Sequence, residues 1–294
     1  MDNTRRQKAT YCLLRPGGAR IAPLIRRNKS IALWLGEAQE EFDHVVFLEE
    51  PLSWFQRRRI LKNSGLKNIK FEDVSSIFPL GPGESWDSSS AHRLGYSLMC
   101  RFFSYTVWGL LDGYDEVFRI DSDLVMVSAP TALDPSVGFL TGAVVRESHR
   151  ETLATLPNPL KERGLTWETP EVPYTNFFGS RVDFWLQGNR RRSMESLVYN
   201  SDFLENRWGD APLIGAFVQS AGDVGLHNIV SAEVRYFHGS NFDLIADGKI
   251  LKGVGAPLRE VAQRCRVGSF KAIFEQRRQP RLRPMAVGDS KKYS

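Results

Sequence analysis

Short apolar runs alternate with segments of helical periodicity through the first third of the chain. The apolar runs predict strands at residues 10–14, 44–48 and 69–74. Apolar positions at helical spacing predict helices at residues 21–42 and 54–62, one between each pair of strands. Because parallel strands need such crossover connections, we expect an α/β fold with a mixed, mostly parallel, Rossmann-like central sheet that is flanked by helices.

The next regular pattern predicts a long helix over residues 91–111, whose buried stripe contains Leu94, Leu98 and Phe102. Arg101 lies seven residues after Leu94 and therefore projects from nearly the same face. A guanidinium on that side must bind an anion, which is either a carboxylate of the core or the phosphate of a ligand. Beyond residue 123 the pattern is less regular, and it predicts strands at residues 139–145, 174–178 and 233–237 and helices at residues 182–199 and 211–220.

Composition and charge narrow the class of protein. With 42% hydrophobic and 25% charged residues among 294, the chain is globular rather than disordered. Its formal net charge of +5 is uneven, because six basic residues lie between Arg277 and Lys292. The rest of the chain is close to neutral, so nucleic-acid binding is not expected. The three cysteines, Cys12, Cys100 and Cys265, are widely spaced and form no C-x-x-C motif. Cys12 and Cys100 lie in apolar segments and are expected to be buried, unpaired thiols.

The domain organisation is expected to be simple, because no internal repeat and no linker precede residue 253. We expect a flexible N-terminus at residues 1–8, one catalytic domain at residues 9–252 and an extension at residues 253–294 with a basic, mobile tail. No stretch approaches the roughly 18 apolar residues of a membrane span, and no signal-peptide core opens the chain. These features predict a cytoplasmic protein without a membrane span.

Two carboxylates, Asp121 and Asp123, follow the apolar residues 117–120. Side chains at positions i and i+2 of an extended segment point to the same side, so both carboxylates can face one ligand. Oxygen ligands of this kind hold Mn²⁺ or Mg²⁺, and such a cation can bind a diphosphate. Open α/β sheets bind their ligands at the carboxyl ends of strands. The alternative is an acidic turn with no ligand.

Two further aspartates have both a structural and a chemical interpretation. Asp210 precedes a predicted helix and fits an N-cap, although with Trp208 it could also form the edge of a sugar site. Asp183 fits a capping box with Ser180, or it could face a bound sugar and stabilise or attack its anomeric carbon. Late in the chain, the imidazoles that could reach a metal at the acidic pair are those of His227 and His238.

Taken in order, these segments resemble the fungal α-1,2-mannosyltransferases of glycosyltransferase family 15. The likeness extends from about residue 9 to about residue 238. It rests on ATYCLLR at residues 9–15, FLEEPL at 47–52, MCRFFS at 99–104, the strand and acidic pair at 114–125, and RWGDAP at 207–212. The resemblance implies a GT-A fold, a nucleotide-diphosphate sugar donor (GDP-mannose in the family), Mn²⁺, and transfer with retention of configuration.

The resemblance also implies roles for individual residues. Asp121 and Asp123 occupy the positions of the family's metal motif, Arg101 occupies a position near the donor, and Asp183 occupies that of the proposed nucleophile. His227 falls near a family histidine. Two matched segments place Arg15 and Glu49 at the nucleotide.

The sequence also departs from the family pattern. Gly179 replaces a family tryptophan, Leu98 replaces a histidine, and the family's membrane anchor is missing, so the chain resembles a divergent member.

The leading hypothesis is therefore a metal-dependent retaining glycosyltransferase that moves a mannose-like sugar to a glycan or other hydroxyl acceptor. Trp208 and Asp210 would shape the sugar or acceptor site. One alternative is a haloacid-dehalogenase-like phosphatase, but its D-x-D motif lies near the N-terminus and is followed by Gly-Thr, whereas Leu124 and Val125 follow here. Another alternative is a GT-A-fold protein that binds glycans or nucleotides without transfer, which the departures at Asp183 and Gly179 would explain.

Overall fold

The computed structural model describes residues 8–15, 18–80, 84–85, 94–127, 139–221, 234–239, 243–246 and 248–252. The chain divides into two units, Met1–Gly255 and Ala256–Ser294, and every described residue belongs to the first. Three features of the sequence therefore lie outside the described residues: the predicted metal ligand His227, the residue Cys265 and the predicted basic tail.

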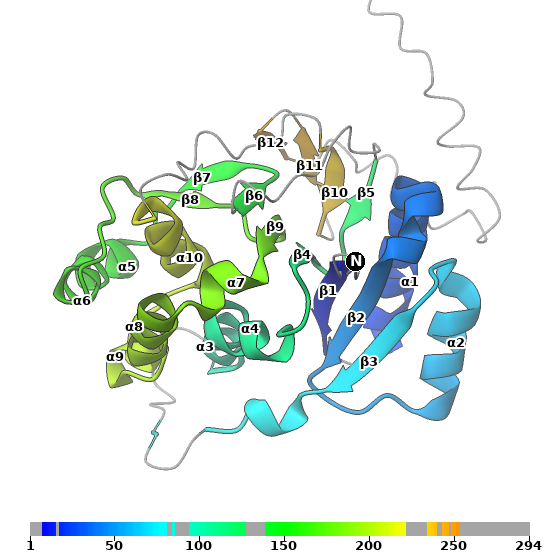
Figure 1. Cartoon of the computed structure of the whole chain (residues 1–294), viewed down its shortest axis with the longest axis horizontal. Helices are drawn as coiled ribbons and strands as arrows, with labels where there is room; N and C mark the ends of the chain where they lie inside the picture. Colours follow the sequence, from blue (N-terminus) through cyan, green and yellow to red (C-terminus); the bar gives the residue numbers. More distant parts are fainter. Residues whose placement is uncertain are drawn as a thin grey trace, which may run out of the picture. The chain divides into compact units, whose positions relative to one another are not determined.

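A six-stranded sheet forms the centre of the first unit (Figure 1). Its first four strands are mutually parallel and its last two run antiparallel to their neighbours, which confirms the predicted mixed, mostly parallel sheet. The order across the sheet is β3 (Ile69–Asp73), β2 (Phe42–Leu48), β1 (Lys8–Leu14), β4 (Glu116–Ile120), β9 (Phe177–Arg181) and β6 (Phe139–Thr141).

The first two crossover helices form where the periodicity predicts them. Helix α1 (Gly18–Leu35) continues into the 3₁₀ segment η1 (Gly36–Glu41), and α2 (Trp54–Ser64) joins β2 to β3. A capping box starts α2, because the Ser53 side chain accepts from the backbone N–H of Gln56, whose side chain accepts from the N–H of Ser53. Gly65 ends it at a φ of 72°, a left-handed conformation that favours glycine.

The predicted long helix is present from residue 94 but contains one wider turn. It consists of α3 (Leu94–Arg101), the π-helical turn η3 (Phe102–Thr106) and α4 (Val107–Leu110). Other predictions were wrong in their extent, among them the strand expected at residues 174–178, which is β9 at Phe177–Arg181. The helix expected at residues 182–199 is broken at Gln187, whose ψ of 129° is not helical. The strand expected at residues 139–145 turns between two sheets.

The remaining elements are short. They are η2 (Ser75–Ile77), β5 (Val125–Met126), β7 (Val144–Arg146), α5 (Arg150–Thr155), α6 (Pro157–Glu162), β8 (Glu171–Pro173), α7 (Val182–Leu186), α8 (Gly188–Val198), α9 (Ser201–Glu205), α10 (Asp210–Gln219), β10 (Tyr236–His238), β11 (Asp243–Ala246) and β12 (Lys249–Leu251). Strands β12, β11, β10 and β5 form a second sheet, and β7 pairs with β8. None of the described helices combines the length and apolar character needed to cross a bilayer.

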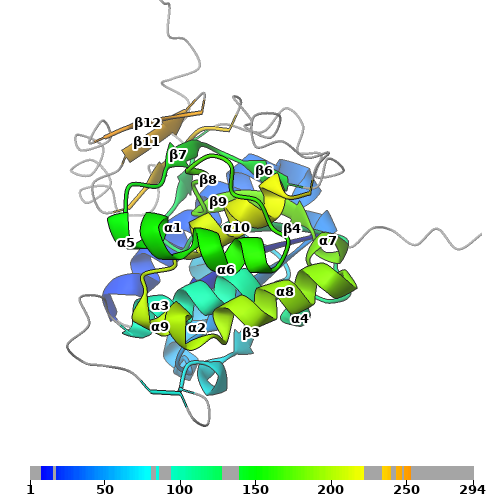
Figure 2. The same cartoon turned by 90° about the vertical axis from the view of Figure 1, so that its left-hand side faces the viewer.

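Both faces of the parallel strands are buried, which explains their continuous apolar runs. Along β1, Tyr11 and Leu13 belong to one hydrophobic cluster, whereas Cys12 and Leu14 belong to a second cluster with residues of α1 and α2. The first cluster is much the larger and includes residues of α3, α4, α8 and α10. Figure 2 shows α6, α8 and α9 in front of the sheet in the perpendicular view. Cys12 and Cys100 are buried, unpaired thiols, as predicted.

Candidate functional site

The acidic pair lies at the carboxyl edge of the parallel strands, in the turn that leads from β4 to β5. The backbone N–H of Asp121 donates to the carbonyl of Asn176 at 3.0 Å, and the N–H of Leu124 donates to the carbonyl of Asp121 at 3.1 Å. Because this segment turns, it is not the extended dipeptide that the sequence argument assumed. The two carboxylates therefore have different partners, and Asp121 is the more buried, with a side chain 23% exposed against 46% for Asp123.

Asp123 faces an imidazole that arrives from the second sheet. Strand β10 pairs with β5 in the register Phe237 to Val125, which brings His238 back to the turn. The Nε2 atom of His238 lies 3.6 Å from Oδ1 of Asp123. The other ring nitrogen of His238, Nδ1, lies 3.0 Å from Tyr174 Oη. The structure thus joins two of the predicted site residues and orients the histidine through a tyrosine that the sequence argument did not include.

The buried guanidinium of Arg119 binds Asp121. Arg119 Nε donates to Asp121 Oδ1 at 2.9 Å, and its NH1 binds Asp210 Oδ2. The guanidinium also lies over the ring of Phe103, 3.4 Å from its centroid. Burial opposes the charge, but Asp121 and Asp210 raise the pKa of Arg119. Burial raises the pKa of Asp121, and Arg119 acts in the opposite direction.

The RWGDAP segment contributes to this network from within the core. Gly209, not Asp210, is the N-cap of α10, so the predicted capping role of Asp210 was wrong. Asp210 is instead the first helical residue, and its carboxylate binds Arg119 and lies 3.8 Å from the Cys100 thiol. The indole of Trp208 is 1% exposed and donates to Thr155 Oγ1 at 2.8 Å. Its buried ring has no face on which a sugar could stack.

Asn176 is a candidate residue that the sequence analysis missed. It immediately precedes β9, and β9 runs antiparallel to β4 with Phe177 opposite Ile120, so Asn176 lies beside Asp121. Its Oδ1 accepts from Tyr236 Oη at 2.9 Å, whereas its buried Nδ2 has no hydrogen-bond partner among the described residues. A buried amide donor without a partner is costly unless a ligand accepts from it.

Arg27 is a second residue that was missed. This fully buried side chain of α1 donates to the carbonyls of Ile120 at 3.0 Å and Tyr11 at 3.3 Å, and to Asn28 Oδ1 at 2.8 Å. No described carboxylate forms an ion pair with it. The signal in the sequence was a basic residue amid the apolar positions of a crossover helix.

Arg15 and Glu49, the predicted nucleotide contacts, lie together at the same edge of the sheet. They follow the carboxyl ends of β1 and β2, where the N–H of Glu49 donates to the carbonyl of Leu14 at 3.0 Å. Arg15 Nε is 3.5 Å from Glu49 Oε2 and 3.8 Å from Glu50 Oε1. Burial raises the pKa of Glu49 and the charge of Arg15 lowers it.

Arg101 binds a carboxylate of the protein, which is the first of the two alternatives that its position left open. Its NH1 and NH2 donate to both carboxylate oxygens of Glu84 at 2.9 and 2.7 Å, and its Nε donates to the carbonyl of Val198 at 3.0 Å. Its guanidinium also lies 4.8 Å from the ring centroid of Tyr199. In this structure Arg101 therefore ties α3 to α8.

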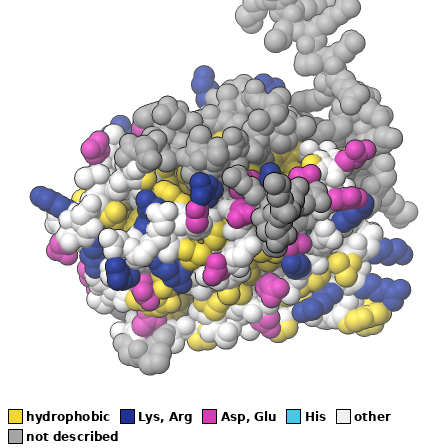
Figure 3. Space-filling model, in the orientation of Figure 1, with side chains coloured by type: hydrophobic (Ala, Val, Ile, Leu, Met, Phe, Trp, Pro, Cys, Tyr) yellow, Lys and Arg dark blue, Asp and Glu magenta, His cyan; other side chains and the backbone are white. Residues whose placement is uncertain are grey.

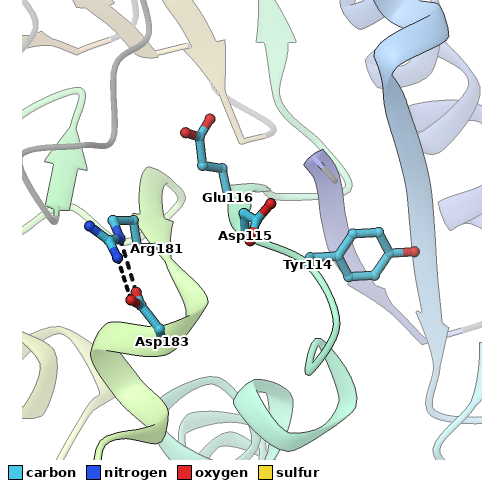
Figure 4. Close-up of a pocket in the computed structure, with 5 residues that line it drawn as sticks. All are labelled: Tyr114, Asp115, Glu116, Arg181 and Asp183. Carbon is cyan, nitrogen blue, oxygen red and sulfur yellow. Dashed lines mark hydrogen bonds and ion pairs between the residues drawn. The ribbon is translucent and has the colours of Figure 1, made fainter. Parts of the chain in front are cut away.

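Asp183 lies at the other end of β4 from the acidic pair. Glu116, the first residue of β4, is opposite Arg181, and Asp183 follows two residues later. The predicted capping box with Ser180 was wrong, because Arg181 is the N-cap of α7 and no side chain caps the helix. Asp183 forms an ion pair with Arg181, as Figure 4 shows. These two residues line a cavity of about 120 Å³ with Tyr114, Asp115 and Glu116.

The residues at the carboxyl edge suit a divalent cation in part. Among the residues that the structure describes, no three His, Cys, Asp or Glu side chains are arranged to hold an ion. Asp123 and His238 nevertheless offer one oxygen and one nitrogen donor 3.6 Å apart, and the contact between Tyr174 and Nδ1 leaves Nε2 for a ligand. Asp121 Oδ2 accepts no hydrogen bond from a described residue and could serve as a further ligand.

Comparison with known proteins identifies the fold. No protein-family model matches the sequence, and no curated protein matches it. The chain is similar in structure to core-mannan synthase A from Aspergillus fumigatus in an Mn/GDP form, with a TM-score of 0.66 and 15% identity over 81% of this chain and 76% of that chain. It is also similar to the mannosyltransferase Ktr4p from S. cerevisiae in complex with GDP, with a TM-score of 0.63 and 15% identity over 83% of this chain and 73% of that chain. These similarities confirm the predicted GT-A fold.

Proposed function

We propose that this chain is a metal-dependent glycosyltransferase that moves a mannose-like sugar from a nucleotide-diphosphate donor to a glycan or other hydroxyl acceptor, with retention of configuration. The observation that carries the proposal is the approach of His238 Nε2 to Asp123 Oδ1 at the carboxyl edge of the parallel strands. Open α/β sheets bind ligands at this edge. The Mn and GDP named for the structural neighbours support a cation and GDP-mannose as the favoured donor.

In this proposal Asp123, His238 and the second oxygen of Asp121 hold Mn²⁺ or Mg²⁺. The cation, when bound, would neutralise the diphosphate and so favour its departure as a leaving group. Tyr174 keeps Nε2 of His238 turned toward Asp123 through its contact with Nδ1. Arg119 positions Asp121 by holding Oδ1, which leaves Oδ2 toward the ligand.

Asn176 and Arg15 are proposed to contact the donor directly. The buried Nδ2 of Asn176 would donate to an oxygen of the phosphate or sugar, which would satisfy its missing hydrogen bond. The Arg15 side chain, which is 58% exposed at the end of β1, would approach the nucleotide from the neighbouring strand.

The placement of Asp183 argues against the role of nucleophile that the resemblance implied. Asp183 lies beyond the amino end of β4, so the whole five-residue strand separates it from the acidic pair. Its carboxylate forms an ion pair with Arg181. A side chain there cannot contact the anomeric carbon of a donor that is held at Asp121.

The two aspartates provide a matched pair of variants. Asp123→Asn should lower sugar transfer or donor hydrolysis by at least about a hundredfold with Mn²⁺ present, because it weakens the proposed metal site. Asp183→Asn makes the same chemical change at the opposite end of the strand and should retain activity. Activity is measured as release of nucleoside diphosphate from GDP-, UDP- and dTDP-sugars. Loss of activity in Asp183→Asn together with full activity in Asp123→Asn would refute the proposed site.

A second candidate function is donor binding without transfer. It is favoured by the ion pair between Arg119 and Asp121, which occupies one oxygen of the acidic pair. A thermal-shift screen with and without Mn²⁺ separates the two functions, since any ligand of the native state raises the unfolding midpoint. A donor that raises the midpoint but is never turned over would support binding alone.

A further inference from the structure

Helix α2 presents an unusual surface to solvent. Its inward face contains Ile60 and Ser64, the buried residues of the helix. Positions four residues apart share a helix face, and on the opposite side two such rows combine aromatic and basic residues. We call these five exposed residues the basic–aromatic face: Trp54, Phe55, Arg58, Arg59 and Lys62.

The two rings of this face project from the first turn of the helix. Trp54 is 61% exposed and Phe55 is 78% exposed, and the two rings meet edge to face with centroids 5.0 Å apart. The guanidinium of Arg58 lies 5.0 Å from the centroid of the Trp54 ring. Figure 3 shows hydrophobic and basic side chains next to one another at the lower right, where α2 lies in Figure 1.

The positive charge of this helix has little compensation. Helix α2 contains four basic residues and no acidic one. Arg57 is turned toward β3, with its guanidinium 5.6 Å from the centroid of Phe71. The other three basic side chains form no ion pair with any described residue. The acidic residues that precede the helix, Glu49 and Glu50, face Arg15.

We propose that the basic–aromatic face docks on an anionic lipid surface. Tryptophan and phenylalanine favour the boundary between headgroups and acyl chains, and arginine and lysine are attracted to the phosphates of an anionic leaflet. The inward face packs on the protein, so the helix lies on the bilayer and inserts only its outward side chains. This surface is a feature of α2 and does not depend on the proposed glycosyl transfer.

The test is flotation of the full-length protein with two kinds of vesicle, one of phosphatidylcholine alone and one containing phosphatidylserine. Reversal of charge in R58E/R59E/K62E should weaken binding to the anionic vesicles by at least about a hundredfold, since each basic residue near such a surface contributes about fivefold. Removal of the rings in W54A/F55A should weaken it by roughly tenfold or more. Binding of the unmodified protein should fall when the salt concentration rises.

Matched variants elsewhere on the described surface serve as controls. R150E/K161E/R192E makes the same change of charge on α5, α6 and α8, and L110A/L153A removes two exposed apolar side chains; both should bind like the unmodified protein. All variants are first compared by thermal unfolding, which exposed substitutions should not change. The proposal is overturned if the α2 variants bind as well as the controls. It is also overturned if the protein ignores vesicles but binds RNA or an acidic protein through the same side chains.

Discussion

The strongest stability prediction concerns Arg119, whose guanidinium connects Asp121 to Asp210 in the core. Its side chain is 4% exposed, and that of Asp210 is 7% exposed. In Arg119→Met a side chain of similar length has no charge, so the buried carboxylate of Asp210 and the partly buried carboxylate of Asp121 lose their common partner. Breaking a buried ion pair from one side costs about 3–5 kcal/mol. That is a large part of the 5–15 kcal/mol that typically stabilises a domain.

A double-mutant cycle in urea measures this coupling. The free energy of unfolding is compared for the unmodified protein, Arg119→Met, Asp210→Asn and the double variant at pH 7. The double variant should be more stable than the sum of the two single losses predicts, by about 2 kcal/mol or more, because it no longer leaves Asp210 buried as an unpaired charge. The penalty of Arg119→Met should also shrink as the pH falls, because burial raises the pKa of Asp121 and the loss of Arg119 raises it further, so this carboxylate becomes neutral more readily.

Two results would refute this reasoning. The first is an Arg119→Met protein within about 1 kcal/mol of the unmodified protein, a value typical of surface substitutions rather than of a broken buried ion pair. The second is strict additivity in the cycle, which would mean that Arg119 and Asp210 do not interact.

Three further predictions follow from buried contacts. Burial lowers the pKa of His44 to about 3, below its unfolded value of about 6.5, so the folded state binds fewer protons and loses stability as the pH falls. The loss of unfolding free energy from pH 7 to pH 5 is about 2 kcal/mol, and His44→Gln should abolish this part of the pH dependence in urea unfolding. Gly179→Ala should lower the free energy of unfolding by about 1–3 kcal/mol, because the new Cβ would lie 2.6 Å from the Phe118 ring. In the control Gly188→Ala the Cβ meets nothing within 4 Å and should not destabilise the protein, so equal midpoints of the two variants in thermal unfolding would contradict this prediction. Asn176→Asp should weaken donor binding, measured by calorimetry, by at least about tenfold, because a carboxylate repels the diphosphate. The control is Tyr236→Phe, which removes only the hydrogen bond to Asn176 Oδ1. Equal donor affinity in the unmodified protein and both variants would show that the Asn176 amide does not contact the donor.

The parallel part of the fold was predictable because each strand there is buried on both faces. Such strands read as continuous apolar runs, and the crossover helices between them show their own periodicity. The errors came where tertiary contacts override local pattern. Residues 139–145 contain only one polar side chain, that of Thr141, and therefore resemble a single strand. Their local pattern does not show that the chain leaves one sheet at Gly142, where Tyr236 lies 2.6 Å from the position of a Cβ.

The candidate site was predictable only in part, for a similar reason. The strand that delivers Asp121 and Asp123 is a local feature, and so is visible in the sequence. The approach of His238 depends on antiparallel pairing between β10 and β5, which are over a hundred residues apart. The strand register that moves Asp183 to the wrong end of β4 is equally non-local. A motif match fixes the order of residues along the chain but not the edge of the sheet at which each one lies.

The charge of Arg27, a buried residue of α1, affects ligand capture without a direct contact to the ligand. All three of its hydrogen bonds end on oxygen atoms of uncharged groups, one of which belongs to Ile120, the neighbour of Asp121. Its positive charge therefore adds to the electrostatic field at that end of the sheet. Such long-range attraction changes the rate of association more than the lifetime of a complex. We expect an uncharged residue at this position to slow the arrival of an anion while leaving its departure nearly unchanged.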